Sequence, residues 1–290
     1  MNTDVEEVLR GEAAWSICCD DAIKWMDSFP AQSVHMVIGS PPYPTKDRYG
    51  SDQKKWKVFD WVDWMFDVTL AACRVSKGDV LWVVNGPVVN NEYHAAVEGL
   101  IWKVYQHRWL EQGNITCERP CVWHKNAAPN RKNWFANNWE FVVCFRRVDS
   151  VRHWDWEAIA EPPKYKAGGR FRQRNAKGER VLGNEYPQVK LARPKDVIRA
   201  TVGGGHMGSK LASENEAPFP EKLIEPFVRS LCPVGGILCD PFGGSFSTLS
   251  VALKNNRRFV GCDLRQSQVD LGMRRAMETE NGITKEAKAA

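Results

Sequence analysis

The sequence predicts an α/β protein with a mostly parallel central sheet covered by helices on both faces. Short apolar runs rich in β-branched residues are each followed by turn residues, a pattern typical of buried strands. Longer stretches with apolar residues at helical spacing separate these runs, and such alternation implies parallel pairing. Because ligands of such sheets bind beyond the carboxyl ends of the strands, the residues after each strand are the first candidates for a site.

Six strands and three helices carry this prediction. The strands are Trp15–Cys19, His35–Gly39, Val80–Val84, Phe141–Phe145, Ile237–Cys239 and Phe259–Cys262. The helices are Trp61–Val75, Phe246–Leu253 and Ser267–Met277. Residues 146–207 break the alternation, since they are rich in glycine, proline, arginine and lysine. We therefore expect an insertion at 146–207 between a first half at 1–145 and a second half at 208–290.

Composition restricts the class of protein. The chain has 290 residues, of which 43% are apolar and 26% are charged. No run of 18 uncharged apolar residues exists, so we expect no membrane span. The acidic start of the chain lacks the features of a secretory signal, and the nine cysteines are an odd number, which fits reduced thiols better than a closed disulfide framework. A cytoplasmic location is expected.

Basic residues cluster in the predicted insertion. The whole chain has a formal net charge of +5, but residues 164–195 alone contain ten basic and two acidic side chains. Such a segment is expected of a nucleic-acid contact, because neutralising phosphates releases counterions. A solvated loop explains the charge equally well.

The first candidate motif, Ser40-Pro41-Pro42-Tyr43, follows the predicted strand His35–Gly39. Two consecutive prolines fix the backbone and remove two N–H donors, so a hydroxyl, a carbonyl and an aromatic ring are held together at a strand end. This set suits a planar base with an exocyclic amine: Tyr43 stacks on the ring, while the Ser40 hydroxyl and the Pro41 carbonyl accept the amine hydrogens. An ordinary turn with a proline pair is the alternative.

The second candidate motif, Asp240-Pro241-Phe242-Gly243-Gly244-Ser245, follows the strand Ile237–Cys239. A glycine turn between a strand and a helix brings backbone N–H groups close to a ligand, and Asp263 after the next strand can bind ribose hydroxyls. The dinucleotide pattern G-x-G-x-x-G is absent, and the Asp240 carboxylate would repel a pyrophosphate. It would attract an ammonium group, such as that of S-adenosylmethionine.

In this order, the motifs resemble the amino-group DNA methyltransferases of the β arrangement, in which the catalytic motif precedes the cofactor motif. Trp15–Cys19 with Asp20 resembles the opening of the family, and Ser40–Tyr43 its S/D/N-P-P-Y/F/W motif. The segments Cys121–Asn126 and Trp139-Glu140 resemble its later sheet motifs, and Ala217–Leu223 resembles the helix that helps hold the cofactor. The resemblance covers nearly the whole chain. It implies a Rossmann-like, circularly permuted methyltransferase sheet with an inserted target-recognition region.

The resemblance also implies a role for each site residue. The catalytic residues would be Ser40, Pro41, Pro42 and Tyr43. The residues that bind S-adenosylmethionine would be Asp20, Phe219, Asp240, Pro241, Phe242, Gly243, Gly244, Ser245 and Asp263. Contacts to double-stranded DNA are expected from Lys46, Arg48, Arg170, Arg172, Arg174 and Lys177. No metal is expected, since Cys117, Cys121 and His124 supply fewer than the four ligands of a structural zinc site.

The expected reaction transfers a methyl group to the exocyclic amine of a flipped-out DNA base. Serine at the first position of the motif resembles the cytosine-N4 enzymes more than the adenine-N6 enzymes, so cytosine N4 is the preferred target. Nucleoid association, a homodimer and a cognate restriction endonuclease are further expectations.

One residue departs from the family, because Phe246 stands where a second glycine is usual. Its ring would either crowd the cofactor loop or pack against the helices. A nicotinamide-dependent oxidoreductase and a catalytically inactive DNA-binding module are the alternatives from other classes. The first gives no role to Ser40–Tyr43, whereas the second would explain both Phe246 and the basic insertion.

Overall fold

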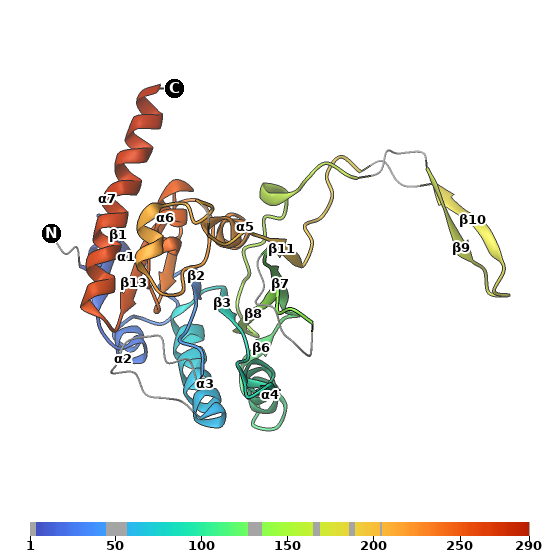
Figure 1. The fold of residues 1–290 in the computed structure, drawn as a ribbon, viewed down its shortest axis with the longest axis horizontal. Coiled ribbons are helices and arrows are strands. Elements are labelled where there is room, and N and C mark those ends of the chain that lie inside the picture. Colours follow the sequence, from blue (N-terminus) through green and yellow to red (C-terminus); the bar gives the residue numbers. More distant parts are fainter. Residues whose placement is uncertain are drawn as a thin grey trace. The chain divides into compact units, whose positions relative to one another are not determined.

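Nine strands form one sheet in the part of the chain that the computed structural model describes (Figure 1). That part comprises residues 4–44, 57–126, 135–164, 169–185, 189–203 and 205–289, without the side chains of residues 171 and 286–289. The main path of the sheet runs through β1 (Trp15–Cys19), β13 (Arg258–Asp263), β12 (Ile237–Asp240), β2 (Met36–Gly39), β3 (Asp79–Val84), β8 (Trp139–Arg147), β7 (Cys121–His124) and β11 (Val197–Arg199). The short strand β6 (Ile115–Cys117) pairs with β8 off this path.

Strands from the two ends of the chain interleave in the half of the sheet that begins at the edge strand β1. Strands β12 and β13, from the C-terminal part, lie between β1 and β2, from the N-terminal part. All four pairings from β1 to β3 are parallel, with Trp15 opposite Phe259 and Leu238 opposite Met36. The mostly parallel α/β sheet predicted from the sequence is therefore confirmed.

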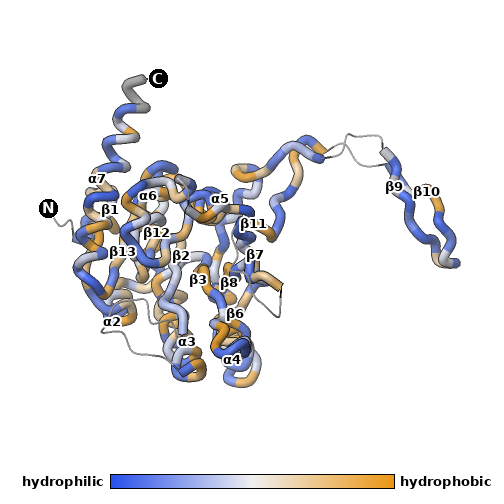
Figure 2. The backbone as a smooth tube through the Cα atoms, in the orientation of Figure 1, coloured by the Kyte–Doolittle hydropathy of each residue, from blue (hydrophilic) through white to orange (hydrophobic). Residues whose placement is uncertain are grey.

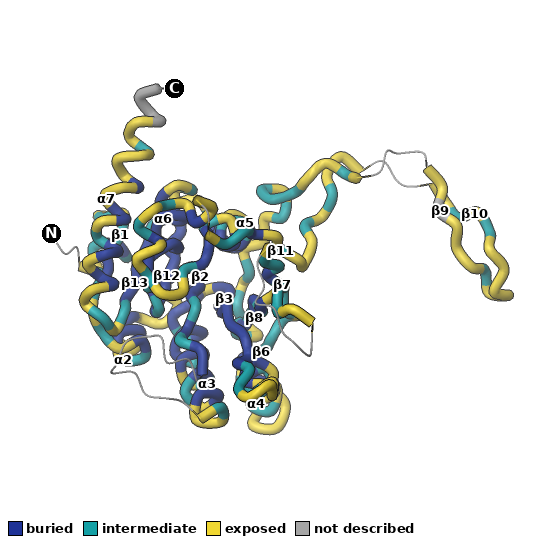
Figure 3. Tube along the Cα trace, viewed as in Figure 1, coloured by how far each residue is buried: buried dark blue, intermediate teal, exposed yellow. Residues whose placement is uncertain are grey.

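Helices cover the sheet on two sides and enclose two separate clusters of buried apolar residues. One cluster packs α1 (Val5–Arg10), α2 (Ala22–Asp27), α3 (Val58–Val75) and α4 (Ala96–Trp109) against the sheet. The other packs α5 (Glu221–Leu231), α6 (Ser247–Lys254) and α7 (Gln266–Ala289). Figure 2 shows the apolar strands between these layers, and Figure 3 shows that they are buried. No described helix is long and apolar enough to cross a membrane.

The central strands are apolar at nearly every position because both of their faces are covered. Every residue of β2, β3 and β12 is buried. The same continuous burial explains why these strands could be predicted, since a run of four to six apolar residues between turns is too short for a typical helix. The buried Asp79, at the start of β3, is held by the guanidinium of Arg152 at 2.6 Å.

The predicted strand Phe141–Phe145 forms the middle of β8, which runs antiparallel to β3 and places Val80 opposite Phe145. An apolar run carries no information on strand direction, so the sequence could not reveal this reversal. Antiparallel pairing continues to β7 and β6, and only β11 returns to a parallel pairing, with β7. A short antiparallel hairpin follows β3 and consists of two strands of two residues each, β4 (Val88–Val89) and β5 (Glu92–Tyr93).

The chain divides into two compact units, which we describe separately. The larger unit contains residues 1–154 and 196–290, and the smaller unit contains residues 155–195. The smaller unit holds a 3-10 helix, η1 (Glu157–Ile159), and an antiparallel hairpin of β9 (Arg170–Arg174) and β10 (Arg180–Glu185). The expected insertion at 146–207 is wider than this unit, since β11 belongs to the central sheet.

Candidate active site and cofactor pocket

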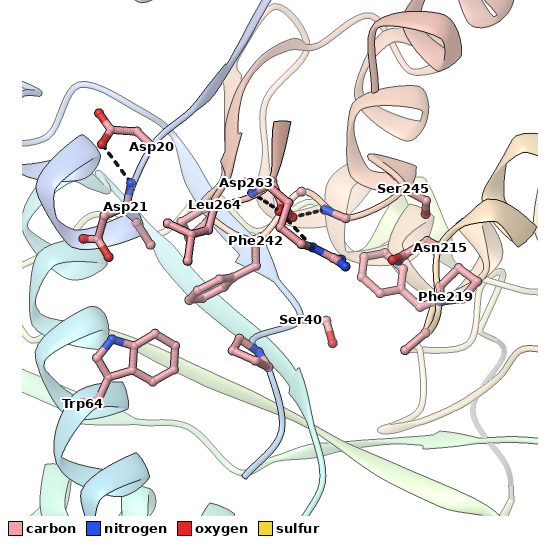
Figure 4. A pocket seen from close by; sticks show the side chains of 18 residues that line it. Asp20, Asp21, Ser40, Trp64, Asn215, Phe219, Phe242, Ser245, Asp263 and Leu264 are labelled. Atoms are coloured by element: carbon pink, nitrogen blue, oxygen red, sulfur yellow. Dashed lines mark hydrogen bonds and ion pairs between the residues drawn. The ribbon is translucent and has the colours of Figure 1, made fainter. Parts of the chain in front are cut away.

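A cavity of about 340 Å³ opens at the carboxyl ends of the parallel strands in the larger unit. Asp20 follows β1, Ser40 follows β2, Pro241 follows β12, and Asp263 ends β13. These four ends meet because neighbouring parallel strands finish at the same edge of a sheet. The cavity walls therefore combine both motifs of the sequence, as Figure 4 shows for Ser40, Phe242 and Asp263.

Most of the predicted cofactor residues line this cavity. They are Asp20, Phe219, Pro241, Phe242, Gly243, Gly244, Ser245 and Asp263. Asp240 is the exception, because it is completely buried behind the wall. Its Oδ1 accepts a hydrogen bond from the backbone N–H of Phe242 at 2.9 Å, so the carboxyl holds the loop after β12.

Burial dominates the electrostatics of Asp240 and raises its pKa to about 7. The nearby Thr248 hydroxyl and the Phe242 N–H act in the opposite direction and favour the carboxylate. The Oδ2 atom and the Thr248 hydroxyl are both buried and make no hydrogen bond of good geometry within the described residues. Gly39 of β2 provides the space for the carboxyl, since a Cβ at Gly39 would lie 2.6 Å from Asp240 Oδ1.

The glycine turn depends on Asp263 for its shape. Gly244 has a φ of +51°, a conformation that costs glycine little. Its N–H donates to Asp263 Oδ2 at 2.9 Å, and the N–H of Arg265 donates to Asp263 Oδ1 at 3.0 Å (Figure 4). Burial raises the pKa of Asp263, whereas these N–H donors lower it. The carboxylate thus organises the turn, and Asp263 also lines the cavity.

The ring of Phe246 does not crowd the cavity. The residue caps α6 with a φ of +51°, and its side chain is fully buried. A Cβ at Gly243 or Gly272 would lie only 2.3 or 2.4 Å from the ring, which shows how closely both glycines pack against it. Phe246 also meets Phe259 edge-on. Of the two outcomes expected for this departure, the structure shows packing between the helices.

Three residues of the motif Ser40–Tyr43 form hydrogen bonds, each to a different strand or helix. Ser40 Oγ donates to the Val83 carbonyl of β3 at 2.9 Å, and Trp61 Nε1 of α3 donates to the Pro42 carbonyl at 2.7 Å. The Tyr43 hydroxyl donates to Glu140 Oε2 of β8 at 2.6 Å. Ser40 and Pro42 line the cavity, whereas Pro41 and Tyr43 are buried beside it. These bonds fix the strand end rigidly.

Four polar or aromatic lining residues were not predicted from the sequence, and two more residues support the site from behind. The lining residues are Asp21, Trp64, Asn215 and Arg265, and the supporting residues are Glu140 and Lys125. Asp21 had a detectable signal, because an aspartate before a helical run is a frequent N-cap, and its carboxylate accepts from the N–H groups of Ile23 and Lys24. Arg265 lies only two residues after Asp263, whereas Trp64 lies on α3 and Asn215 lies in the loop before α5.

A family model described as a DNA methylase, N6_N4_Mtase, matches residues 34–274. The chain belongs to this family. The N6/N4 DNA methylases are DNA methyltransferases that use S-adenosylmethionine, and so is this chain.

Similarity to other DNA methyltransferases supports the assignment to the DNA methylases. The chain is 22% identical to the DNA adenine methyltransferase YhdJ of Escherichia coli, an alignment that covers 95% of this chain and 87% of YhdJ. It is 23% identical to the type II methyltransferase M.ScaI of Streptomyces caespitosus, over 88% of this chain and 79% of M.ScaI. Both alignments span most of each protein.

Solved structures share the fold. The PvuII DNA methyltransferase, which is cytosine-N4-specific, superimposes with a TM-score of 0.65 and 15% identity, over 90% of this chain and 86% of that one. A DNA modification methylase of Thermus thermophilus, solved with S-adenosyl-L-methionine, gives 0.58 and 20% identity, over 91% and 93%. The similarity confirms the methyltransferase sheet.

The cavity of this DNA methylase fits its cofactor chemically. Asp20, Asp21 and Asp263 place three carboxylates in the wall, while the lining cation Arg265 is bonded to Glu216 at 3.0 Å. The balance is acidic, which suits a molecule that carries a sulfonium and an ammonium group. The rings of Trp64 and Phe242 lie edge to face beside these acids, with centroids 5.8 Å apart, and supply apolar wall.

The remaining predicted residues belong to the smaller unit or lie outside the described part. Arg170, Arg172 and Arg174 lie on β9 of the smaller unit, and Lys177 lies in the turn before β10. Lys46 and Arg48 lie outside the described residues. Within the described residues, no group of three or more His, Cys, Asp or Glu side chains could hold a metal ion.

Proposed function

We propose that this DNA methyltransferase acts on the exocyclic N4 amine of cytosine, which it binds flipped out of duplex DNA. The observation that carries the proposal is Ser40, a neutral hydroxyl at the first motif position, whose side chain lines the cofactor cavity. Its proton is directed to the Val83 carbonyl at 2.9 Å. The lone pairs of Oγ are therefore available to accept a hydrogen bond from an amine.

The backbone of the motif supplies the second acceptor. In the part of the chain that the structure describes, no protein donor bonds the Pro41 carbonyl, whereas the Pro42 carbonyl accepts from Trp61. An aryl amine is a poor nucleophile because its lone pair is delocalised into the ring. Two acceptors, Ser40 Oγ and the Pro41 carbonyl, would draw the nitrogen toward tetrahedral geometry, and such fixed dipoles act without reorganisation.

The residues of the cavity would orient the reactants. S-adenosylmethionine supplies the methyl group when bound. Asp20, Asp263 and the glycine turn would hold the cofactor, and Tyr43 would stack on the target base. Positioning of this kind accounts for much of the rate in displacement reactions that need no acid or base at the transferred group. The alkylated amine would then lose a proton to water.

Adenine N6 is the second candidate target. The relative YhdJ is named a DNA adenine methyltransferase, while the structural neighbour from PvuII is named cytosine-N4-specific. Both bases present an amine on a planar ring, so the acceptors at Ser40 and Pro41 suit either. Serine at the first motif position resembles the cytosine enzymes, and on that ground we place cytosine first.

Transfer of a labelled methyl group tests the proposal. The purified chain is incubated with genomic duplex DNA and S-adenosylmethionine that carries tritium in its methyl group, and acid-insoluble label is counted. We expect label in the DNA with the native chain and a strong reduction with Ser40→Ala, while the cofactor affinity of this variant stays within about twofold in calorimetry. Absence of label with the native chain would favour a DNA-binding module without activity.

A further inference from the structure

Arg275, on α7 of the larger unit, is completely buried. Arginine is almost never fully buried unless it is paired, because removing its charge from water is costly. Arg275 is also the first residue after the span 34–274 that matches the family model, so the match assigns it no role. The reason for a buried charge at this position must therefore lie in its own contacts.

The guanidinium of Arg275 bonds to four separate segments. Nε donates to Ser250 Oγ of α6 at 3.1 Å, and Nη1 donates to the Ser245 carbonyl of the glycine turn at 3.1 Å. Nη2 donates to Glu221 Oε1, at the start of α5, at 2.8 Å and to the Met207 carbonyl at 3.4 Å. One side chain thus connects α7 to α6, to the glycine turn, to α5 and to the segment before α5.

Two of these contacts lie directly behind the cofactor cavity. Ser245 lines the cavity as part of the glycine turn, and Phe219 lines it from the segment before α5 (Figure 4). Glu221 follows Phe219 by two residues and is the first residue of α5. Ser247 Oγ, at the start of α6, donates to the Phe219 carbonyl at 3.1 Å. Arg275 therefore joins two parts of the cavity wall from behind, the turn at Ser245 and the chain that leads into α5.

The partner carboxylate of Arg275 is itself firmly held. Glu221 Oε1 accepts from Arg275, and Glu221 Oε2 accepts from Lys254 Nζ at 2.7 Å. Gly208 has a φ of +87°, and a Cβ at this glycine would lie 2.2 Å from the Glu221 Cδ atom. The carboxylate thus has a cation on each oxygen and a glycine backbone packed against it. Its position, and with it the start of α5, is fixed.

Packing alone does not account for an arginine at position 275. Replacing a buried ion pair by apolar residues of similar volume is often neutral or stabilising, so an apolar side chain could fill the same space. The guanidinium differs from an apolar group, and from the point charge of lysine, because it holds several acceptors at once in a fixed planar geometry. Here the acceptors are the carbonyl of Ser245 and the carboxylate of Glu221.

We propose that Arg275 is a positioning residue for S-adenosylmethionine. Its guanidinium holds the glycine turn at Ser245 and the start of α5 at Glu221 in the relative position that the cofactor requires. Groups that bind a ligand must be held within about 0.5 Å of their productive geometry by the residues behind them. Arg275 is fully buried and acts only through these partners. The inference concerns the cofactor and goes beyond the proposed choice of target base.

Two variants of the full chain test this role, and a neighbouring arginine provides the control. Arg275→Met keeps an unbranched apolar stem and removes every donor. Arg275→Lys keeps a charge for Glu221, but a single nitrogen cannot reproduce the fork that also bonds Ser245. The matched control is Arg274→Met, since Arg274 is half-exposed on the same helix and pairs with Glu214 at 2.6 Å. Such exposed pairs contribute little. Circular dichroism and urea unfolding establish which variants are folded.

The dissociation constant of S-adenosylmethionine is measured by calorimetry without DNA. We expect Arg275→Met to raise it about tenfold, the fold-change that corresponds to one hydrogen bond from a charged group. Arg275→Lys should raise it as well, by a smaller factor, and Arg274→Met should leave it unchanged. In methyl-transfer assays the KM for the cofactor should rise in parallel, while kcat at saturating cofactor stays near the native value. A purely structural residue would lower the free energy of unfolding and leave the dissociation constant of the folded protein unchanged.

The outcomes are decisive for Arg275 and separate from the proposed function. A native dissociation constant in folded Arg275→Met and Arg275→Lys would overturn the inference. If Arg275→Met does not fold, Arg275→Lys alone decides in the same way. An equal loss of affinity in Arg274→Met would also overturn it, because the effect would not depend on the buried guanidinium. A native chain that binds the cofactor but methylates no DNA would contradict the proposed function and leave the role of Arg275 standing.

Discussion

The Tyr43 hydroxyl donates a hydrogen bond of 2.6 Å to Glu140 Oε2, and this bond connects the end of the Ser40–Tyr43 motif to strand β8. Lys125 Nζ donates to the other oxygen of the same carboxylate at 2.5 Å. Tyr43 and Glu140 are both buried. A carboxylate at this depth needs its partners, so the network gives a physical reason for tyrosine, rather than phenylalanine, at this position.

Replacing Tyr43 by phenylalanine removes the donor to Glu140 and keeps the ring. We expect kcat to fall about tenfold, which corresponds to about 1.4 kcal/mol, with cofactor affinity unchanged. Tyr43→Ala, which also removes the stacking surface, should cost about 1–3 kcal/mol more. Single-turnover kinetics and calorimetry provide the two measurements.

We expect Glu140 to act as a positioning residue for Tyr43, and a double-mutant cycle tests this expectation. Tyr43→Phe and Glu140→Gln share one interaction, so their effects on kcat should not add. Arg10→Gln with Glu12→Gln, an exposed pair far from the motif in the sequence, is the control and should leave kcat unaltered. Fully additive effects of the Tyr43 and Glu140 variants would show that the hydrogen bond has no part in positioning the ring.

Replacing Asp263 by alanine should weaken binding of S-adenosylmethionine by about 1.5–3 kcal/mol, the usual range for hydrogen bonds to a charged group. The Asp263 carboxylate lines the cavity and also holds the Gly244 and Arg265 N–H groups. Asp263→Asn keeps an acceptor for one of these groups and should lose less. An unchanged dissociation constant for Asp263→Ala in calorimetry would remove this residue from the cofactor site.

Gly39→Ala should destabilise the fold by about 1–3 kcal/mol, because overpacking a close-packed interior forces neighbours to shift. The added Cβ would lie 2.6 Å from Asp240 Oδ1, a fully buried atom that holds the loop after β12. Gly282→Ala is the matched control, since its Cβ would meet nothing within 4 Å in α7, and it should stabilise by up to about 1 kcal/mol. Urea unfolding of the two variants measures the difference. Equal stability of the two would mean that the space beside Asp240 is not needed.

Protonation of His35 should lower the free energy of unfolding as the pH falls from about 6.5 to about 4. Burial lowers the pKa of His35 to about 4, and the positive charges of Lys77 and Arg258 act in the same direction. Its Nδ1 accepts from the Ile237 N–H at 3.0 Å, which requires that atom to be unprotonated. The unfolded chain takes up the proton first, so the contribution is complete above pH 6.5 and is lost as the pH falls toward 4.

A comparison with His35→Asn isolates this contribution from other titrating groups. Asp240 acts in the opposite sense, because its pKa is raised to about 7 and its protonation favours the folded state as the pH falls. The difference in unfolding free energy between the native chain and His35→Asn cancels the Asp240 contribution. That difference should shrink between pH 6.5 and pH 4. A difference that stays constant across this range would contradict the assignment.

The sequence predicted the strands of the parallel core because each is buried on both faces and therefore largely apolar. It predicted most of the cavity wall because neighbouring parallel strands end at the same edge of a sheet. Residues that follow different strands in the sequence can therefore be expected to lie close together. Trp64 and Asn215 could not be found in this way, since each reaches the cavity from a helix face or a loop. Their positions depend on tertiary packing.

Asp240 illustrates a second limit of sequence reasoning. An aspartate that follows a strand predicts a ligand for a cation. The Asp240 side chain instead turns inward and accepts a hydrogen bond from the Phe242 N–H. The missing information was the space left by Gly39 on the neighbouring strand, which lies far earlier in the chain. Phe246 is the opposite case, because it departs from the family pattern and yet its ring fits inside the fold. The absence of a Cβ at Gly243 and Gly272 leaves the space for the ring.

Identification of the methylated nucleoside tests both the methyltransferase activity and the choice of cytosine N4. Duplex DNA from a host without methyltransferases is treated with the chain and S-adenosylmethionine, digested to nucleosides and analysed by mass spectrometry, with Ser40→Ala as the inactive control. We expect N4-methylcytosine as the main product of the native chain. N6-methyladenine as the main product would contradict the choice of base and leave the methyltransferase intact, whereas no methylated nucleoside at all would contradict the function itself.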